Sequence, residues 1–330
     1  MGAKDRLLVF ERSTLAPMLS SRWLGAGARA FLPVVGPSIA HHLDDLSVLN
    51  APMPPLDWPR ESERVWILAP HPDDESLGCA GLLSRCAKRN VPAKIVFLTG
   101  GDGTRTTQFA LKVNPRFGGP YDLLSIARER QIEARNAANA LGLSDDAIEF
   151  LGYPDGGMEE IWRRGFSARA PYVSPFTAKM RVPYDNARSP RAPFCRGSVL
   201  DDLKSSLEEF RPTLVLSTPA FDTHRDHRAA FAFLERALQE TPVRPDFWTF
   251  LIHCGVWPMP NGLHPELRLV PPARLLHKHA WHALELSSDE LERKRRALSC
   301  HATQMASTPR YLNAFVRGNE LFCPATRNTL

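Results

Sequence analysis

The sequence predicts an α/β protein in which helices cover both faces of a mostly parallel sheet. Short, uniformly apolar segments alternate with longer segments of helical periodicity between residues 65 and 238. This alternation is typical of parallel strands joined by helical crossovers. The apolar segments lack an inside–outside pattern, as expected for strands that are buried on both faces. The 330 residues are 43% hydrophobic and 23% charged, which excludes a mainly disordered or coiled-coil chain.

The elements follow from these patterns in chain order. Residues 65–69, with the sequence VWILA, suit a buried strand, and a helical pattern then begins at residue 77. The predicted strands are 65–69, 93–98, 148–151 and 213–217, and the predicted helices are 77–88, 123–141, 199–210 and 226–238. A later helical stripe opens after a cap at Ser287 or Ser288, with Glu290 nearby.

The chain divides into an N-terminal extension, residues 1–60, and one large domain, residues 61–330. The extension has weak periodicity and ends in the proline-rich stretch 51–59. Within the domain, the regular pattern stops over residues 156–197, which hold seven arginines and five prolines. Long irregular segments in compact domains are usually functional or disordered, so we expect a lid or a substrate-site insertion here.

Composition limits the partners and the compartment. The formal net charge of +5 permits attraction to anions without requiring it, and the basic residues lack the aromatic interleaving of a nucleic-acid module. The six cysteines form no C-x-x-C pair, which favours a reducing, cytoplasmic location. Charged residues interrupt the start of the chain, so no secretory signal is expected. Residues 23–40 are too interrupted to span a bilayer, although peripheral contact with a membrane stays open.

Two polar clusters follow two of the predicted strands. The sequence HPDDE (71–75) comes after strand 65–69, and THRDH (223–227) comes after strand 213–217. The carboxyl ends of strands in an open α/β sheet are where ligands bind. We therefore expect the two clusters to meet at one edge of the sheet.

The residue types of these clusters indicate a metal site. His71, Asp74 and His227 offer two nitrogens and one oxygen, and three such ligands with an open position are typical of catalytic zinc. Iron or manganese in the divalent state (Fe2+ or Mn2+) would also fit these ligands. The competing interpretation is that the carboxylates only cap a helix N-terminus, but this leaves the second cluster unexplained.

The remaining polar residues of the clusters suggest amide hydrolysis. Asp73 can take a proton from an attacking water, His224 can donate to a leaving amine or support the oxyanion, and Asp226 can hold His224 in one tautomer. A metal that polarises a carbonyl, together with a base for water, suits this reaction.

The sequence APHPDDE (69–75) together with HRDH (224–227) resembles the PIG-L (LmbE-like) family of N-acetylglucosaminyl-phosphatidylinositol de-N-acetylases. Two helical motifs agree with it. Arg130, Glu133, Ala137, Leu141 and Gly142 match the family's R-x-x-E helix, and Lys294, Ala297, His301 and Gln304 match its K-x-x-A-x-x-x-H motif, with Thr303 in place of the usual serine. LGYPDG (151–156) matches a further family segment.

This resemblance implies a Rossmann-like fold and a zinc-dependent deacetylase that acts on N-acetylglucosamine linked to a lipid, inositol, malate or another aglycone. It implies the same ligands, His71, Asp74 and His227, with Asp73 as the base.

Three residues are weaker candidates for substrate contacts. Arg130 would hold a substrate hydroxyl or anion, although core packing with an Arg–Glu pair is an equal alternative. Asp155 would contact a sugar hydroxyl, although a turn explains it as well, and Glu75 is the third candidate. The helix that carries Lys294 and His301 is expected to buttress the site.

The function predicted from the sequence is removal of an N-acetyl group from an N-acetylglucosamine-type conjugate, small or lipid-linked. The alternatives are a deacylase of another small N-acyl substrate, such as a thiol conjugate or antibiotic precursor, and a non-catalytic anion-binding module with a structural metal. The sequence leaves the oligomeric state open.

Overall fold

The computed structural model describes residues 53–103 and 122–325. Their seven-stranded sheet has the order β3-β2-β1-β4-β5-β7-β6. The strands are β1 Val65–Ala69, β2 Ala93–Thr99, β3 Ile148–Tyr153, β4 Leu214–Ser217, β5 Asp246–Thr249, β6 His282–Glu285 and β7 Asn319–Pro324. The pairs among β1 to β5 are parallel, and β7 runs antiparallel to both β5 and β6. The predicted mostly parallel α/β sheet is confirmed.

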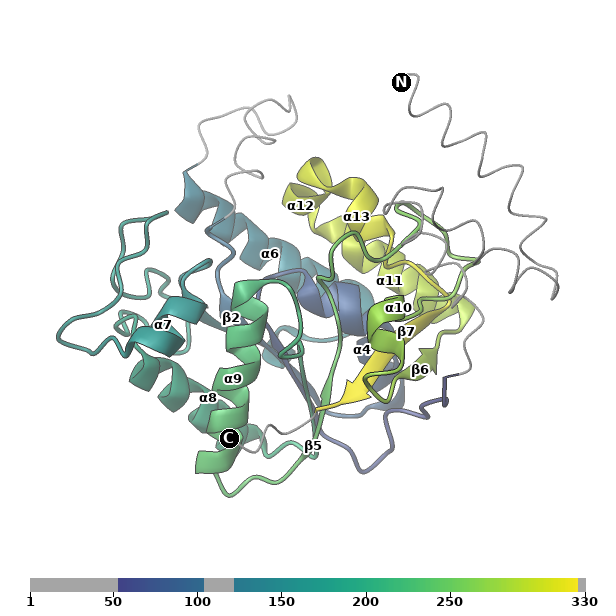
Figure 1. Cartoon of the computed structure of the whole chain (residues 1–330), viewed down its shortest axis with the longest axis horizontal. Helices are drawn as coiled ribbons and strands as arrows, with labels where there is room; N and C mark the ends of the chain where they lie inside the picture. The colour runs from purple at the N-terminus through teal and green to yellow at the C-terminus, as the bar shows by residue number, and fades with distance from the viewer. Residues whose placement is uncertain (1–52, 104–121, 326–330) are drawn as a thin grey trace. The chain divides into compact units, whose positions relative to one another are not determined.

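Helices cover both faces of this sheet (Figure 1). They are α4 Asp74–Arg89, α6 Leu123–Leu141, α7 Met158–Arg164, α8 Arg196–Phe210, α9 Arg225–Glu240, α10 Ala273–Leu276, α11 Ser288–Cys300, α12 Ala302–Ser307 and α13 Pro309–Asn313, with a 3-10 turn at Asp145–Ala147. One core lies between the sheet and α4, α6 and α11, and the other lies between the sheet and α7, α8 and α9.

Strand β1 shows why its sequence is apolar at every position. Val65, Ile67 and Ala69 belong to the core on the α4 side, whereas Trp66 and Leu68 belong to the core on the α9 side. All five side chains are fully buried. A central parallel strand therefore leaves no position at which a polar residue would be solvated.

The structure differs from the sequence prediction at several elements. Helix α4 begins at Asp74, three residues before the predicted start, because the polar HPDDE segment hides its first turn. Strands β5, β6 and β7 were not predicted, since they are only four to six residues long and contain polar residues. The predicted cap of α11 is confirmed, because Ser287 and Glu290 form a reciprocal capping box.

Most of the predicted N-terminal extension lies outside the described residues. Its described end, 53–60, contacts the sheet: Leu56 N–H donates to Ala283 O, and Trp58 packs edge-on against Trp248. The excursion 156–197 contains α7, and it buries Val182, Tyr184 and Phe194 against the second core. The six cysteines are free thiols. Among the described helices, none combines the length and apolar character needed to cross a bilayer.

A fully buried ion pair binds backbone groups of α4. Lys294 Nζ lies 2.8 Å from Glu320 Oε1 and donates to Leu77 O at 2.8 Å, while Glu320 accepts from Gly81 N–H at 2.7 Å. Leu77 O and Gly81 N–H are the groups that a regular helix pairs with each other. The pair therefore bridges α11 and β7 to the first turns of α4.

We predict that Lys294→Met destabilises the fold by about 3–5 kcal/mol, because it leaves the Glu320 carboxylate buried without its counter-charge. The matched control is Lys88→Met on α4, since Lys88 pairs with Asp289 of α11 at an exposed position. That change should alter the free energy of unfolding by less than about 1 kcal/mol. Denaturant unfolding measures both, and equal effects would contradict the role of the buried pair.

Candidate active site

The two polar clusters meet beside the carboxyl ends of β1 and β4. These strands pair directly in the sheet, and β2 and β3 continue from β1 in the opposite direction. The order of the strands therefore reverses between β1 and β4, which is where open α/β sheets form ligand sites. HPDDE makes the turn from β1 into α4, and THRDH makes the start of α9. The expected meeting of the two clusters is confirmed.

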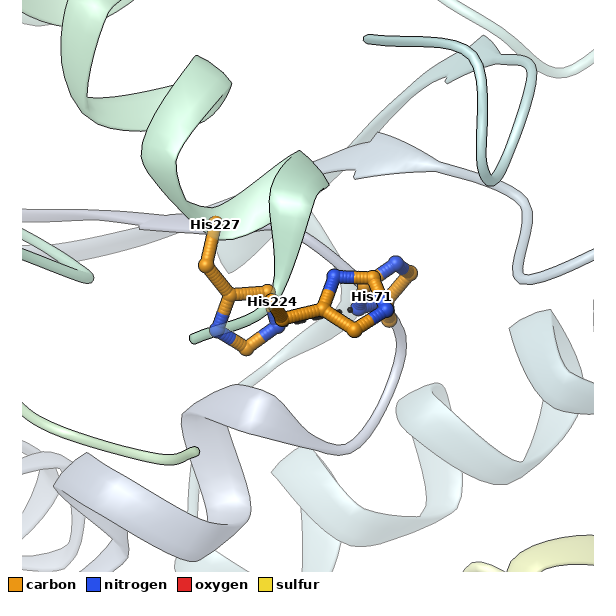
Figure 2. A group of neighbouring side chains, drawn as sticks. All are labelled: His71, His224 and His227. Atoms are coloured by element: carbon orange, nitrogen blue, oxygen red, sulfur yellow. Dashed lines mark hydrogen bonds between the residues drawn. The ribbon is translucent and has the colours of Figure 1, made fainter. Parts of the chain in front are cut away.

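His71, Asp74 and His227 bring three potential ligand atoms together at equal distances. His71 Nδ1 lies 3.2 Å from Asp74 Oδ2, and His227 Nε2 lies 3.2 Å from the same oxygen. The two nitrogens are 3.2 Å apart. All three side chains are buried. Figure 2 shows the rings of His71 and His227 gathered with that of His224 at the start of α9.

Carboxylates on the far side of each imidazole fix its tautomer. His227 Nδ1 lies 3.2 Å from Asp222 Oδ2, and His71 Nε2 lies 3.2 Å from Asp155 Oδ1 and 3.4 Å from Asp226 Oδ2. Because an ionised carboxylate can only accept, these nitrogens carry the protons. In the neutral rings, His71 Nδ1 and His227 Nε2 are left with lone pairs that face Asp74.

When both rings are neutral, three electron-pair donors thus converge on one point, which suits a cation. Ligand atoms about 2.0–2.2 Å from a tetrahedral zinc ion lie about 3.3–3.6 Å from one another, close to the observed triangle. Wider groupings within 4.8 Å also exist: His71 with His224 and His227, Asp74 with His227 and His253, and His71 with Asp155 and Asp226. The 3.2 Å triangle fits a single ion better, since the outer nitrogens are occupied by carboxylates that fix the rings.

Asp73 lies directly beside this triangle in a strained backbone conformation. Its φ of 152° is one that a non-glycine residue rarely adopts. Arg130 Nη2 donates to Asp73 Oδ1 at 3.1 Å and to Pro72 O at 2.9 Å. Burial raises the pKa of the Asp73 carboxyl to about 6, against the opposing charge of Arg130. A carboxylate held in this way has the proton affinity that a general base needs.

His224 is the N-cap residue of α9 and is only partly buried. Its Nδ1 accepts a hydrogen bond from Asp226 N–H at 3.3 Å, so in the neutral ring Nε2 carries the proton. Burial lowers the pKa of His224 to about 4. The ring is therefore a neutral hydrogen-bond donor next to the ligand triangle.

The structure changes the expected partner of Asp226. The sequence predicted that its carboxylate orients His224, but Oδ2 accepts from Gly156 N–H at 2.6 Å and faces His71, and Oδ1 accepts from Met158 N–H. His224 is oriented by the backbone of Asp226 instead. This is because His224 caps the start of α9, where the first backbone N–H groups have no partner within the helix.

The structure places the three predicted substrate contacts among buried partners. Arg130 is buried against Asp73 and backbone carbonyls, including Gly101 O at 3.2 Å. Glu75 is buried and accepts from Asp73 N–H at 3.1 Å, and it lies 3.3 Å from His301 Nε2. Asp155 accepts from Gly103 N–H while it faces His71. All three side chains are buried, and their contact with a substrate stays a prediction.

Three residues of the site were not identified from the sequence. Asp222 accepts from His224 N–H at 2.8 Å and from His253 N–H at 2.9 Å, besides its contact with His227. Its place two residues before His224 was an available signal. His253 follows β5 and Tyr311 lies within α13, two elements that the sequence did not reveal, so no pattern marked them.

Comparisons with known proteins show which family this chain resembles. The family model described as GlcNAc-PI de-N-acetylase matches residues 66–238. A Bacillus anthracis protein named probable N-acetyl-alpha-D-glucosaminyl L-malate deacetylase 2 is 26% identical, covering 75% of this chain and 84% of its own. A 1D-myo-inositol 2-acetamido-2-deoxy-alpha-D-glucopyranoside deacetylase of Mycobacterium sp. (strain JLS) is also 26% identical, covering 77% and 79%.

Among solved structures, the zinc inhibited form of teicoplanin deacetylase Orf2 has a TM-score of 0.51 at 17% identity, covering 81% of this chain and 99% of that one. This likeness shows a shared fold.

We predict that Asp222→Asn weakens metal binding by about 10–100-fold, the usual effect of losing a carboxylate behind a ligating histidine. The amide of an asparagine can donate to His227 Nδ1, which would place the proton on the ligating nitrogen. Competition against a chromophoric chelator measures the affinity, with Asp185→Asn at an exposed position as the control. Unchanged affinity in Asp222→Asn would rule out this orienting role.

Proposed function

Because the chain belongs to the GlcNAc-PI de-N-acetylase (PIG-L) family and is an amide-hydrolysing deacetylase, we propose that it removes the acetyl group from an N-acetylglucosamine-type conjugate with a zinc ion as cofactor. The observation that carries the proposal is the convergence of three lone pairs from His71, Asp74 and His227 within 3.2 Å, beside Asp73.

The residues of the site have separate roles in hydrolysis. A divalent ion held by the three ligands would supply Lewis acidity toward the acetyl carbonyl and toward water. Asp73 takes the proton of the attacking water, and Arg130 keeps its carboxylate in place. The water oxygen joins the carbonyl carbon, the C–N bond breaks, and the nitrogen takes the proton that Asp73 accepted and leaves as the free amine. His224, a neutral Nε2–H donor, stabilises negative charge that develops on the carbonyl oxygen.

Zinc is the ion that the ligand set favours, since two imidazoles and one carboxylate are common around catalytic zinc. Fe2+ and Mn2+ also accept these ligands. The structural relative described as a zinc inhibited form suggests that excess zinc can also block an enzyme of this fold. We therefore propose that one bound ion supports the reaction and that further zinc opposes it.

The substrate class is proposed from the relatives, whose names specify N-acetylglucosamine linked to malate or to inositol. A deacylase of another small N-acyl compound remains the second candidate, because the structural relative acts in teicoplanin biosynthesis. The non-catalytic binding module is set aside, since the chain belongs to a deacetylase family.

We also propose that the excursion 156–197 forms a wall of the substrate site. Its first residues bind the carboxylate of Asp226 through backbone N–H groups. Farther along, Tyr184 OH donates to Asp102 Oδ2 at 3.0 Å, and Asp102 Oδ1 accepts from Asp155 N–H at 3.0 Å. The start of the excursion is thereby attached to Asp226, and Tyr184 is attached through Asp102 to Asp155. The carboxylates of Asp226 and Asp155 face His71 Nε2.

We predict that Asp73→Asn lowers kcat by about 10²–10⁴-fold, because it removes the base while keeping the size of the side chain. Release of acetate from N-acetylglucosaminyl malate and inositol conjugates measures the activity, and metal analysis checks that the ion is retained. Asp289→Asn, an exposed change, is the control. Activity of Asp73→Asn within a few-fold of the parent would refute the assignment of the base.

We predict that chelation abolishes turnover and that one equivalent of Zn2+ restores it, since the ligand atoms cannot polarise a carbonyl by themselves. Titration with Zn2+, Fe2+ and Mn2+ should give recovery that saturates at one ion per chain, followed by inhibition at excess zinc. Full activity in metal-free protein would contradict the proposal.

A further inference from the structure

A fourth histidine, His253, borders the ligand triangle from the loop after β5. Its ring centroid lies 4.7 Å from that of His227 and 5.2 Å from that of His224. A ring nitrogen of His253 lies within 4.8 Å of ligating atoms of Asp74 and His227. His253 and His224 are partly exposed, whereas His71 and His227 are buried. The two partly exposed rings therefore border the ligand triangle on its more open side.

Tyr311 fixes the tautomer of His253. Its hydroxyl lies 2.8 Å from Ile252 O and 3.0 Å from His253 Nδ1, and the planes of the two rings are nearly parallel, at 2°. A carbonyl can only accept, so the single hydroxyl proton of Tyr311 goes to Ile252. The phenolic oxygen must then accept from His253 Nδ1–H. In the neutral ring, Nε2 keeps its lone pair.

His224 has the opposite tautomer. Its Nδ1 accepts from Asp226 N–H, so its Nε2 is a donor. Among the described residues, no hydrogen bond engages Nε2 of either ring. One ring thus offers a donor and the other an acceptor beside the same ion-binding atoms. The centroids of the two rings are 5.2 Å apart.

We propose that His253 Nε2 accepts a hydrogen bond from the N–H of the substrate's acetamido group, while His224 Nε2–H faces its carbonyl oxygen. A secondary amide presents one acceptor and one donor on opposite sides, and the two tautomers match them. The inference rests on the proposed deacetylase function and extends it, because it makes His253 the group that selects an N-acetyl over an O-acetyl substrate. No proton is transferred to His253, so it orients the amide without acting as acid or base.

The preference for an N-acetyl over an O-acetyl substrate arises because an ester lacks the N–H donor of an amide. An ester oxygen has no hydrogen to give, so an O-acetyl group would leave the lone pairs of His253 and of the ester oxygen facing each other. Sites built to bind a polar hydrogen reject analogues that lack it, because a partly desolvated polar group is left unpaired. An N-methylated acetamide lacks the same hydrogen and should be rejected likewise.

The test compares kcat/KM for an N-acetyl sugar and its O-acetyl analogue in the metal-loaded full chain. His253→Leu should lower kcat/KM for the N-acetyl compound by about 10–100-fold and for the O-acetyl compound by less than about 3-fold. His253→Gln, whose side-chain oxygen can accept, should recover part of the amide activity. His277→Leu, at an exposed position outside the site, is the control and should change neither rate.

Equal losses on both substrates, or no loss on either, would overturn the inference. Tyr311→Phe supplies a second readout, because it removes the acceptor for Nδ1–H and should shift the amide-to-ester ratio in the same direction by a smaller factor. Nitrogen-15 NMR of histidine-labelled protein reports the tautomer directly, and a proton on His253 Nε2 at neutral pH would contradict the assignment. If the parent protein hydrolyses no N-acetyl compound, the proposed function itself fails and this inference falls with it.

Discussion

The chemistry of the site depends on three lone pairs that point toward one another, because buried carboxylates fix the side chains that carry them. His71 Nδ1, Asp74 Oδ2 and His227 Nε2 face one another at 3.2 Å because Asp222 occupies the other nitrogen of His227 and Asp155 occupies the other nitrogen of His71. Such an arrangement of electron-pair donors is unfavourable unless a cation lies among them. The carboxylates behind the rings therefore determine the chemistry of the site as much as the ligands do.

The fold supplies the convergence through the point at which its strand order reverses. β1 and β4 are paired, so the turns after them emerge side by side although about 150 residues separate them along the chain. The first turn of α4 carries the strained Asp73, and the Lys294–Glu320 pair ties that helix to α11 and β7. A buried ion pair is weak evidence for stability, but here its two groups bind the backbone of the helix that presents Asp74.

Much of this arrangement could be predicted from the sequence, and the reasons are specific. The apolar run at β1 and the polar clusters after β1 and β4 carry strong local signals, and from them the convergence of His71, Asp74 and His227 could be predicted. The sequence could not show that Arg130 and Glu75 turn inward, because a charged residue near a site has the same sequence signal whether it binds a substrate or a neighbouring backbone. His253 was missed because it follows the short strand β5, whose pattern is ambiguous.

X-ray absorption at the zinc edge, combined with anomalous diffraction from crystals of the zinc-loaded protein, tests the central claim most directly. One ion should lie about 2.0–2.2 Å from His71 Nδ1, Asp74 Oδ2 and His227 Nε2, with the remaining coordination supplied by water. An ion bound through His71 Nε2, an ion at Asp155 and Asp226 instead, or a protein that binds no zinc with these three side chains intact would contradict the account.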